Sequence, residues 1–248
     1  MRIVLKIQYD GTAYCGWQVQ PNGITVQEVI EKAIEGVTGI KVNLVGSGRT
    51  DSGVHAESQV AHFDIDGANI PPEKFSVVLN GVLPSDIKIL SSFKADENFH
   101  ARFKAKRKTY EYKFYVSEFP LPLKSRYATN IPFPVDIEKM KTVAKLLIGR
   151  HDFKCFLASN SSVKDTVREI YASEISEKDG YIIYTVTGNG FLYNMVRIIV
   201  GTLIKVGQGK MAEEGFKNML VSCDRSLAGA TMSPNGLTLK SVEYDYGE

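Results

Sequence analysis

The chain has 248 residues, of which 44% are hydrophobic and 23% charged, and its formal net charge is +2. This composition is typical of a globular protein long enough for two modest domains. The sequence contains no run of about 18 apolar residues that would span a membrane. It also lacks the apolar stretch of a signal peptide near its start. Three scattered cysteines and four histidines in no metal-ligand spacing indicate a reducing cytoplasm and predict no metal site.

The first hundred residues predict the order β-α-β-β-α-β. Residues 2–10 alternate apolar and polar side chains, which is the period of a half-buried strand. Thr25 and Glu28 form a capping-box pattern ahead of apolar residues at helical spacing, so a helix should begin after Thr25. The remaining expected elements are strands at 41–46, 59–65 and 86–93 and a helix that begins at Pro72.

The rest of the chain repeats this order with larger insertions. We expect a long strand at 102–116 and a helix capped by Asp136. The Asp179-Gly180 pair between two strand-like runs predicts a β-hairpin. Residues 191–206 are apolar on nearly every side, which is typical of a buried helix. The remaining expected elements are strands at 167–175, 181–188 and 237–244 and an accessory helix at roughly 211–221.

The duplicated element order predicts an α+β fold of two ferredoxin-like halves with antiparallel sheets, which are able to join across a central cleft. We place the division between residues 1–101 and residues 102–248. The first half then carries the glycine-rich loop described next, and the second carries the basic strand and the apolar helix.

The segment GSGRTDSGVHA, residues 46–56, places the carboxylate of Asp51 among three glycines. Glycine permits positive φ and the close approach of a ligand, so this loop is a candidate site. It is not a dinucleotide-binding fingerprint, because Asp51 occupies the third glycine position, and it lacks the Lys-Ser/Thr end of a phosphate-binding loop. The alternative is a decorated turn in which Asp51 only accepts hydrogen bonds from backbone amides.

The strand expected at 102–116 carries a basic face that ends in two aromatic side chains. Alternate residues of a strand share a face, and the even positions are Arg102, Lys104, Lys106, Lys108, Tyr110 and Tyr112. Cations bind phosphates and an aromatic ring stacks on an unpaired base, so this face predicts contact with RNA. A solvated edge strand, kept from aggregating by its lysines, is the alternative, although it leaves the tyrosines unexplained.

Arg197 lies within the apolar helix expected at 191–206. A buried guanidinium is costly unless it pairs with an anion, and the planar guanidinium of arginine can bind a carboxylate in a bidentate manner. We therefore expect Arg197 to pair with Asp51, which would keep that acid ionised and oriented. The alternative is a side chain that extends along the helix to the surface.

Segments at 6–18, 46–56, 99–112 and 188–201 resemble, in order, the motifs of the tRNA pseudouridine synthase A family, and SPNGLTL at 233–239 also fits. The resemblance covers essentially the whole chain. It implies two RNA-recognition-like halves around a basic cleft, a homodimer, and a cofactor-independent isomerisation of uridine to pseudouridine at positions 38–40 of the tRNA anticodon arm.

The resemblance also implies roles for single residues. Asp51 would be the catalytic aspartate, Tyr110 the tyrosine that stacks on uracil, and Arg197 the partner of the acid. Arg49 would help to hold the flipped nucleotide and its phosphate. The sequence does not decide whether the carboxylate attacks the sugar or removes a sugar proton to give a glycal, and the RNA contacts of the insert at 117–135 stay open.

Two other functional classes remain as alternatives. A non-catalytic RNA-binding protein of duplicated ferredoxin-like units would need the cations and the tyrosines but no carboxylate facing them. A glycosyl hydrolase would ordinarily need two acids that flank one bond, and the loop offers Asp51 with Glu57 six residues later.

Overall fold

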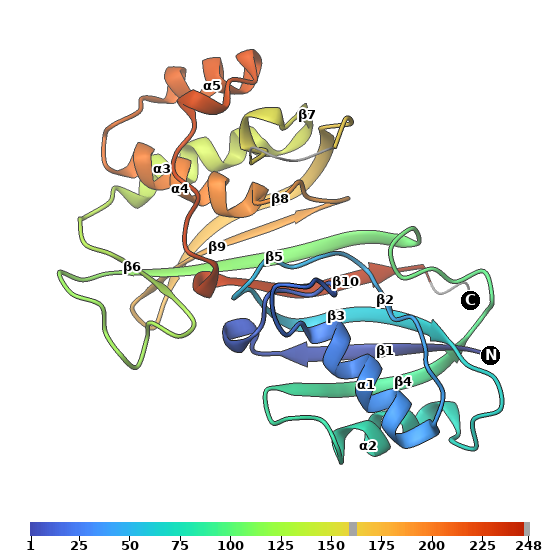
Figure 1. Ribbon diagram of the computed structural model, residues 1–248. Coiled ribbons are helices and arrows are strands. Elements are labelled where there is room, and N and C mark those ends of the chain that lie inside the picture. The colour runs from blue at the N-terminus through green and yellow to red at the C-terminus, as the bar shows by residue number, and fades with distance from the viewer. Residues whose placement is uncertain (159–162, 246–248) are drawn as a thin grey trace. The chain divides into compact units, whose positions relative to one another are not determined.

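The computed structural model describes residues 1–158 and 163–245 and has a mixed α+β architecture in which most strand pairs are antiparallel (Figure 1). These residues divide into two compact units. Unit 1 comprises Met1–Lys106 and the described residues from Thr238 onward, and unit 2 comprises Arg107–Leu237. No helix within the described part of the chain is long and apolar enough to cross a membrane.

Unit 1 is built on three antiparallel strands, β1 (Arg2–Tyr9), β3 (His55–Asp64) and β4 (Ile87–Ala95), with β1 in the middle. The other edge of β3 carries β2 (Val45–Gly46) at one end and β10 (Leu237–Tyr244), which runs parallel to it, at the other. The buried alternate residues of β1 confirm the half-buried strand that the sequence predicted. Strand β3 is thus tied to its neighbours along both edges.

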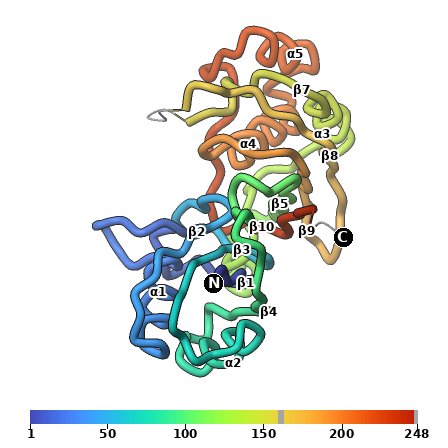
Figure 2. The backbone as a smooth tube through the Cα atoms, turned by 90° about the vertical axis from the view of Figure 1, so that its right-hand side faces the viewer, coloured from blue at the N-terminus to red at the C-terminus, as the bar shows by residue number. Residues whose placement is uncertain are grey.

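Two helices accompany these strands. Helix α1 (Val26–Thr38) begins at the predicted cap, where the hydroxyl of Thr25 accepts a hydrogen bond from the backbone amide of Glu28 at 3.4 Å. The carboxylate of Glu28 accepts a hydrogen bond from Lys32 at 2.6 Å. Figure 2 shows α1 on one side of the strands, and α2 (Phe75–Asn80) packs against both α1 and β4.

Unit 2 contains a second run of antiparallel strands, in the order β5 (Ala105–Val116), β9 (Tyr181–Gly188), β8 (Val167–Lys178) and β7 (Gly149–Asp152). The short strand β6 (Thr129–Ile131) runs parallel to the end of β5. Strands β8 and β9 form the predicted hairpin, and both turn residues, the Asp179-Gly180 pair, have positive φ. This is the conformation that makes Asp-Gly a favourable hairpin pair.

The described residues of unit 2 form three α-helices, α3 (Ile137–Ala144), α4 (Met195–Gly207) and α5 (Glu213–Ser222) (Figure 1). The carboxylate of Asp136 caps α3 by accepting a hydrogen bond from the backbone amide of Lys139 at 3.1 Å, as predicted. Almost every residue of α4 is buried, which confirms the buried helix that its apolar composition indicated.

Several predicted boundaries are wrong. Strand β5 begins at Ala105 rather than at residue 102, because residues 101–104 form a turn. Helix α4 begins after Asn194, whose φ of 59° interrupts the helical conformation. The strand expected at 41–46 is reduced to two residues, and β6 and β7 were not predicted because they are too short to show a period.

The grouping of the last strand also differs from the sequence-based division. That division kept residues 102–248 together, whereas the chain from Thr238 onward groups with unit 1. There Thr238 and Leu239 pair with His55 and Ala56 of β3. Because these partners lie far apart in sequence, no local pattern could reveal the contact.

Candidate active site

Asp51 lies half-buried in the loop between β2 and β3 of unit 1. Its backbone carbonyl accepts a hydrogen bond from the amide of Val54 at 3.1 Å, which closes a turn. Gly53 within that turn has a φ of 78°, a left-handed conformation that favours glycine. The turn itself therefore requires one of the three glycines that surround the carboxylate.

The segment after β1, which carries the first of the sequence motifs, holds this loop in place. The amide of Trp17 donates a hydrogen bond to the carbonyl of Thr50 at 3.1 Å, and the amide of Gly53 donates to the carbonyl of Tyr14 at 3.3 Å. The hydroxyls of Tyr9 and Thr50 lie 2.8 Å apart. The residues on either side of Asp51 are thus fixed to a buried aromatic scaffold.

The beginning of the loop is fixed as well. A Cβ atom on Gly46 would lie 2.6 Å from the indole ring of Trp17, so glycine is needed there for the ring to pack. The hydroxyl of Ser47 donates to the side-chain oxygen of Gln59 at 2.5 Å, and the Gln59 amide group donates to the carbonyl of Gly48 at 3.0 Å. These contacts fix the conformation of the loop that carries Asp51 before any ligand binds. A catalytic side chain requires such a pre-formed support.

Tyr110 lies on β5 within unit 2 and is only 8% exposed. Its ring meets that of Phe191 edge to face, with centroids 5.1 Å apart and planes at 82°. Phe191 stands just ahead of α4, the helix that carries Arg197. The structure therefore places the predicted stacking tyrosine next to the segment that leads into the arginine's helix.

Arg197 is half-buried on α4, and hydrogen bonds to Met232 and Asn194 help to orient its guanidinium. Its Nε donates to the carbonyl of Met232 and its Nη1 to Oδ1 of Asn194, each at 2.7 Å. The backbone amide of Met232 returns a hydrogen bond to the carbonyl of Arg197 at 3.3 Å. The sequence analysis missed both partners: Asn194 sits three residues earlier in the same motif and could have been suspected, whereas Met232 has no local signal.

The two units hold different parts of the predicted site. Asp51 lies in unit 1, as does the exposed Arg49, while Tyr110 and Arg197 lie in unit 2. The pairing of Asp51 with Arg197 therefore stays a prediction. Within each unit, the loop around Asp51 and the surroundings of Arg197 are both held by several hydrogen bonds.

Tyr112, which was predicted to share the RNA-binding face, is fully buried. Its hydroxyl lies 2.7 Å from that of Thr129 and donates to the carbonyl of Ser233 at 2.7 Å. Burial raises the pKa of this phenol. Tyr112 thus anchors the beginning of the SPNGLTL motif, and its ring is not available for stacking on a base.

The four predicted cations do not form one ladder. Arg102 and Lys104 are exposed in the turn before β5, so only Lys106 and Lys108 share a strand face with Tyr110. The ammonium of Lys106 lies 3.2 Å from the carboxylate of Asp245. The contact of these side chains with RNA stays a prediction, with two of the four in the turn and two on the strand.

His62 lies on β3 and accepts a hydrogen bond from the turn at 101–104. The pKa of its imidazole provides a test of the burial of this side chain. Its Nδ1 accepts a hydrogen bond from the amide of Ala101 at 3.2 Å, and burial, aided by the nearby Arg2, lowers its pKa to about 4. The unfolded histidine has a pKa of about 6.5, so the unfolded state binds the proton first as the pH falls. The stabilisation is therefore complete above pH 6.5 and is lost as the pH falls towards 4.

We expect His62→Asn to flatten the dependence of the free energy of unfolding on pH in this window, by less than about 1.4 kcal/mol per pH unit because a single proton is involved and solvent screens it. Asparagine can still accept a hydrogen bond from Ala101. The measurement is urea unfolding at a series of pH values between 4 and 7.5, with His151→Asn on the half-buried His151 as the control. An equal slope in His62→Asn and the wild type would contradict the assignment.

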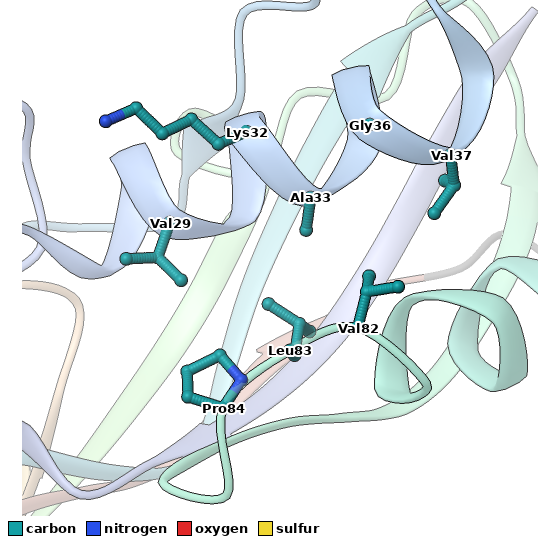
Figure 3. A pocket seen from close by; sticks show the side chains of 8 residues that line it. All are labelled: Val29, Lys32, Ala33, Gly36, Val37, Val82, Leu83 and Pro84. Carbon is teal, nitrogen blue, oxygen red and sulfur yellow. The ribbon is translucent and has the colours of Figure 1, made fainter.

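Within the described residues, neither a metal cluster nor a groove beside α1 adds to the site. The described ranges contain no group of three or more His, Cys, Asp or Glu side chains placed to hold a metal ion. A mostly apolar groove runs between α1 and the loop after α2 (Figure 3). It is lined by Val29, Lys32, Ala33, Gly36, Val37, Val82, Leu83 and Pro84. None of the predicted site residues lines it, so we assign it no catalytic role.

Comparison with known proteins identifies a family. A family model described as tRNA pseudouridine synthase matches residues 6–104 and 143–245, which include Arg49, Asp51 and Arg197 but not Tyr110. The tRNA pseudouridine synthase A of Thermoanaerobacter sp. (strain X514) is 48% identical over 242 residues, which cover 98% of this chain and 99% of that protein. The protein of the same name from Acetivibrio thermocellus is 46% identical with the same coverage.

Among solved structures, a crystal structure of a Cbf5-Nop10-Gar1 complex matches with a TM-score of 0.40 and 15% sequence identity. The match covers 96% of this chain and 49% of that chain. A likeness of this size is too weak to support an inference about fold or function.

Proposed function

Because this chain belongs to the tRNA pseudouridine synthase family, we propose that it isomerises uridine to pseudouridine in tRNA, and more narrowly at positions 38–40 of the anticodon arm. The observation that carries the proposal is the pre-formed loop that holds Asp51 within the part of the chain matched by the family model. A carboxylate fixed in this way, at a half-buried position, suits chemistry at a sugar carbon.

The proposed reaction breaks the C1′–N1 bond, rotates the uracil and joins C5 to C1′. Asp51 acts on the sugar, either as the nucleophile or as the base. The target nucleotide has to leave its stack, and the ring of Tyr110 then supports the extruded uracil. Arg197 keeps the acid ionised and Arg49 binds the phosphate. Because the substrate atoms are only rearranged, the reaction consumes no co-reactant and we expect no cofactor.

The finer architecture and assembly are also proposals. Two ferredoxin-like halves, divided near residue 101, are supported in unit 1 by the antiparallel order β4-β1-β3-β2 and by its two helices. A homodimer in the cytoplasm is proposed from the family resemblance and from the cysteine usage.

The test is to incubate the protein with unmodified tRNA transcripts and to analyse the nucleosides after complete digestion. Pseudouridine in the digest supports the synthase, released uracil would indicate a hydrolase, and bound but unchanged tRNA a binding protein. A transcript in which the uridines at positions 38–40 are replaced by cytidine tests the narrower claim, because it should give no product.

Tyr110→Phe should separate stacking from proton movement. The phenylalanine ring keeps the surface on which uracil stacks, so we expect tRNA affinity to stay near that of the wild type. Loss of the hydroxyl removes any help in moving the C5 proton, so turnover should be slow. Tyr110→Ala should in addition lose about 1–3 kcal/mol of binding free energy. The measurement is filter binding beside single-turnover product formation.

Tyr112→Phe is the matched control, because it removes a buried hydroxyl two residues further along β5. That hydroxyl bonds Thr129 and Ser233, so its loss should lower the melting temperature. If Tyr110→Phe and Tyr110→Ala bind equally weakly and react equally slowly, the proposed division of roles is wrong.

A further inference from the structure

The turn between β4 and β5 exposes one aromatic ring between two cations. Residues 101–104 were expected to belong to a strand but form a turn, and Arg102, Phe103 and Lys104 are all exposed on it. Phe103 is 75% exposed. The guanidinium carbon of Arg102 lies 5.8 Å from the centroid of the Phe103 ring. The whole turn belongs to unit 1.

The base of this turn is fixed by side chains from three strands. The amide of Ala101 donates to Nδ1 of the buried His62 on β3 at 3.2 Å, and the hydroxyl of Tyr244 on β10 donates to the carbonyl of Ala101 at 2.6 Å. From β1, the guanidinium of Arg2 donates to the carbonyl of Phe99 at 2.6 Å. Ala101 itself is buried in an apolar cluster. The position of the turn is therefore defined before any ligand binds.

His100 fixes the tip of the turn in the same way. Its Nδ1 accepts hydrogen bonds from the amides of Arg102 and Phe103 at 3.2 and 3.3 Å, and its carbonyl accepts one from the amide of Lys104 at 2.9 Å. The imidazole lies against the Phe103 ring, with centroids 4.2 Å apart and planes at 32°. The Phe103 ring is thus held out from the surface and oriented by its neighbour.

A single exposed apolar side chain needs no explanation. The Phe103 ring, however, packs against the His100 imidazole, and its two neighbours in the sequence are cations. An oriented ring offers a stacking surface to an unpaired base, and neighbouring cations attract the phosphates on either side of that base. A docking site for another protein would not need the cations. The combination therefore favours a single-stranded segment of RNA as the ligand.

Building on the proposed function, we propose that Phe103 stacks on an unpaired base of the tRNA, while Arg102 and Lys104 bind the adjacent phosphates. Phe103 was not among the residues that the sequence indicated, because an odd position would have faced away from the cations in a strand. In the turn all three side chains are exposed, and the Arg102 guanidinium lies beside the Phe103 ring.

The first test is Phe103→Leu, which keeps an apolar side chain but loses the ring face. We expect tRNA to bind roughly tenfold more weakly, with the loss visible in both Kd and KM, because stacking on a base is lost. Phe103→Tyr should restore affinity. The control is Val221→Ala, which shortens an apolar side chain that is 86% exposed on α5, and it should bind as the wild type does.

The second test places a tryptophan at the same position. In Phe103→Trp the new indole should lose fluorescence when tRNA is added, because a stacked base quenches it. The natural tryptophan, Trp17, is buried and is common to every variant. The control Val221→Trp, at an exposed position on α5, should show no such change.

Three results would overturn the inference. If Phe103→Leu bound tRNA as tightly as an active wild type, the stacking contact would be excluded while the proposed function stood. If Phe103→Leu instead converted a dimer to monomers on size-exclusion chromatography, the turn would be an interface between copies of the chain. If the wild type neither bound nor modified tRNA, the proposed function and this inference would fail together.

Discussion

Asp51→Asn is expected to reduce pseudouridine formation to an undetectable level while changing tRNA affinity by less than about tenfold, or 1.4 kcal/mol. Asparagine keeps the size and shape of the side chain but lacks the anionic oxygen that attacks the sugar or removes its proton. Affinity should survive because phosphate contacts spread over the protein supply most of it. The backbone of the loop should also survive, since the amide of Trp17 and the hydroxyl of Tyr9 hold it through Thr50.

The measurement combines tRNA binding with single-turnover product formation, and a melting curve shows that the variant is folded. Asp66→Asn is the control for removing one negative charge from unit 1, because Asp66 is an exposed residue whose carboxylate pairs only with the amino terminus among the contacts seen in the described residues. It should react like the wild type. A folded Asp51→Asn protein that made pseudouridine at a rate near that of the wild type would show that Asp51 is not the catalyst and that its loop is only a turn.

Local patterns predicted the elements whose signals are themselves local. The caps at Thr25 and Asp136 and the Asp179-Gly180 hairpin were found because each depends on residues within a few positions of one another. The turn at 101–104 was missed because alternating basic residues imitate a strand, whereas the actual conformation depends on His62, which is far away in sequence. The same holds for β10, whose partner β3 lies near the other end of the chain.

The residues of the candidate site also divide into those with a local sequence signal and those whose roles depend on distant parts of the chain. Asp51 and Arg197 could be singled out because a carboxylate among glycines and a guanidinium in an apolar helix are each chemically unusual. Apart from Asn194, which lies in the same motif as Arg197, the residues that position them could not be singled out. Trp17 acts through its backbone amide and ring, and Met232 through its carbonyl, so their roles depend on where the chain passes rather than on the kind of side chain.

The second large effect should come from Gly11, in the motif that supports the Asp51 loop. Gly11 is buried, and a Cβ atom placed there would overlap the carbonyl group of Val54, lying 2.6 Å from its carbon. Gly11→Ala should therefore push Val54, three residues after Asp51, out of position. We expect a loss of about 1–3 kcal/mol in the free energy of unfolding. We also expect a loss of about 100-fold in the rate of pseudouridine formation, because catalysis is sensitive to displacements of about 1 Å.

Gly36→Ala is the matched control, since a Cβ atom at Gly36 meets no heavy atom within 4 Å. Gly36 lies within α1, so alanine there should stabilise the protein by about 0.5–1 kcal/mol and leave the reaction unchanged. The measurements are urea unfolding and single-turnover rates at saturating tRNA. If Gly11→Ala lost stability but reacted at the wild-type rate per folded molecule, the motif would support the fold without positioning Asp51. A loss of rate greater than the loss of folded protein is the result that a positioning role requires.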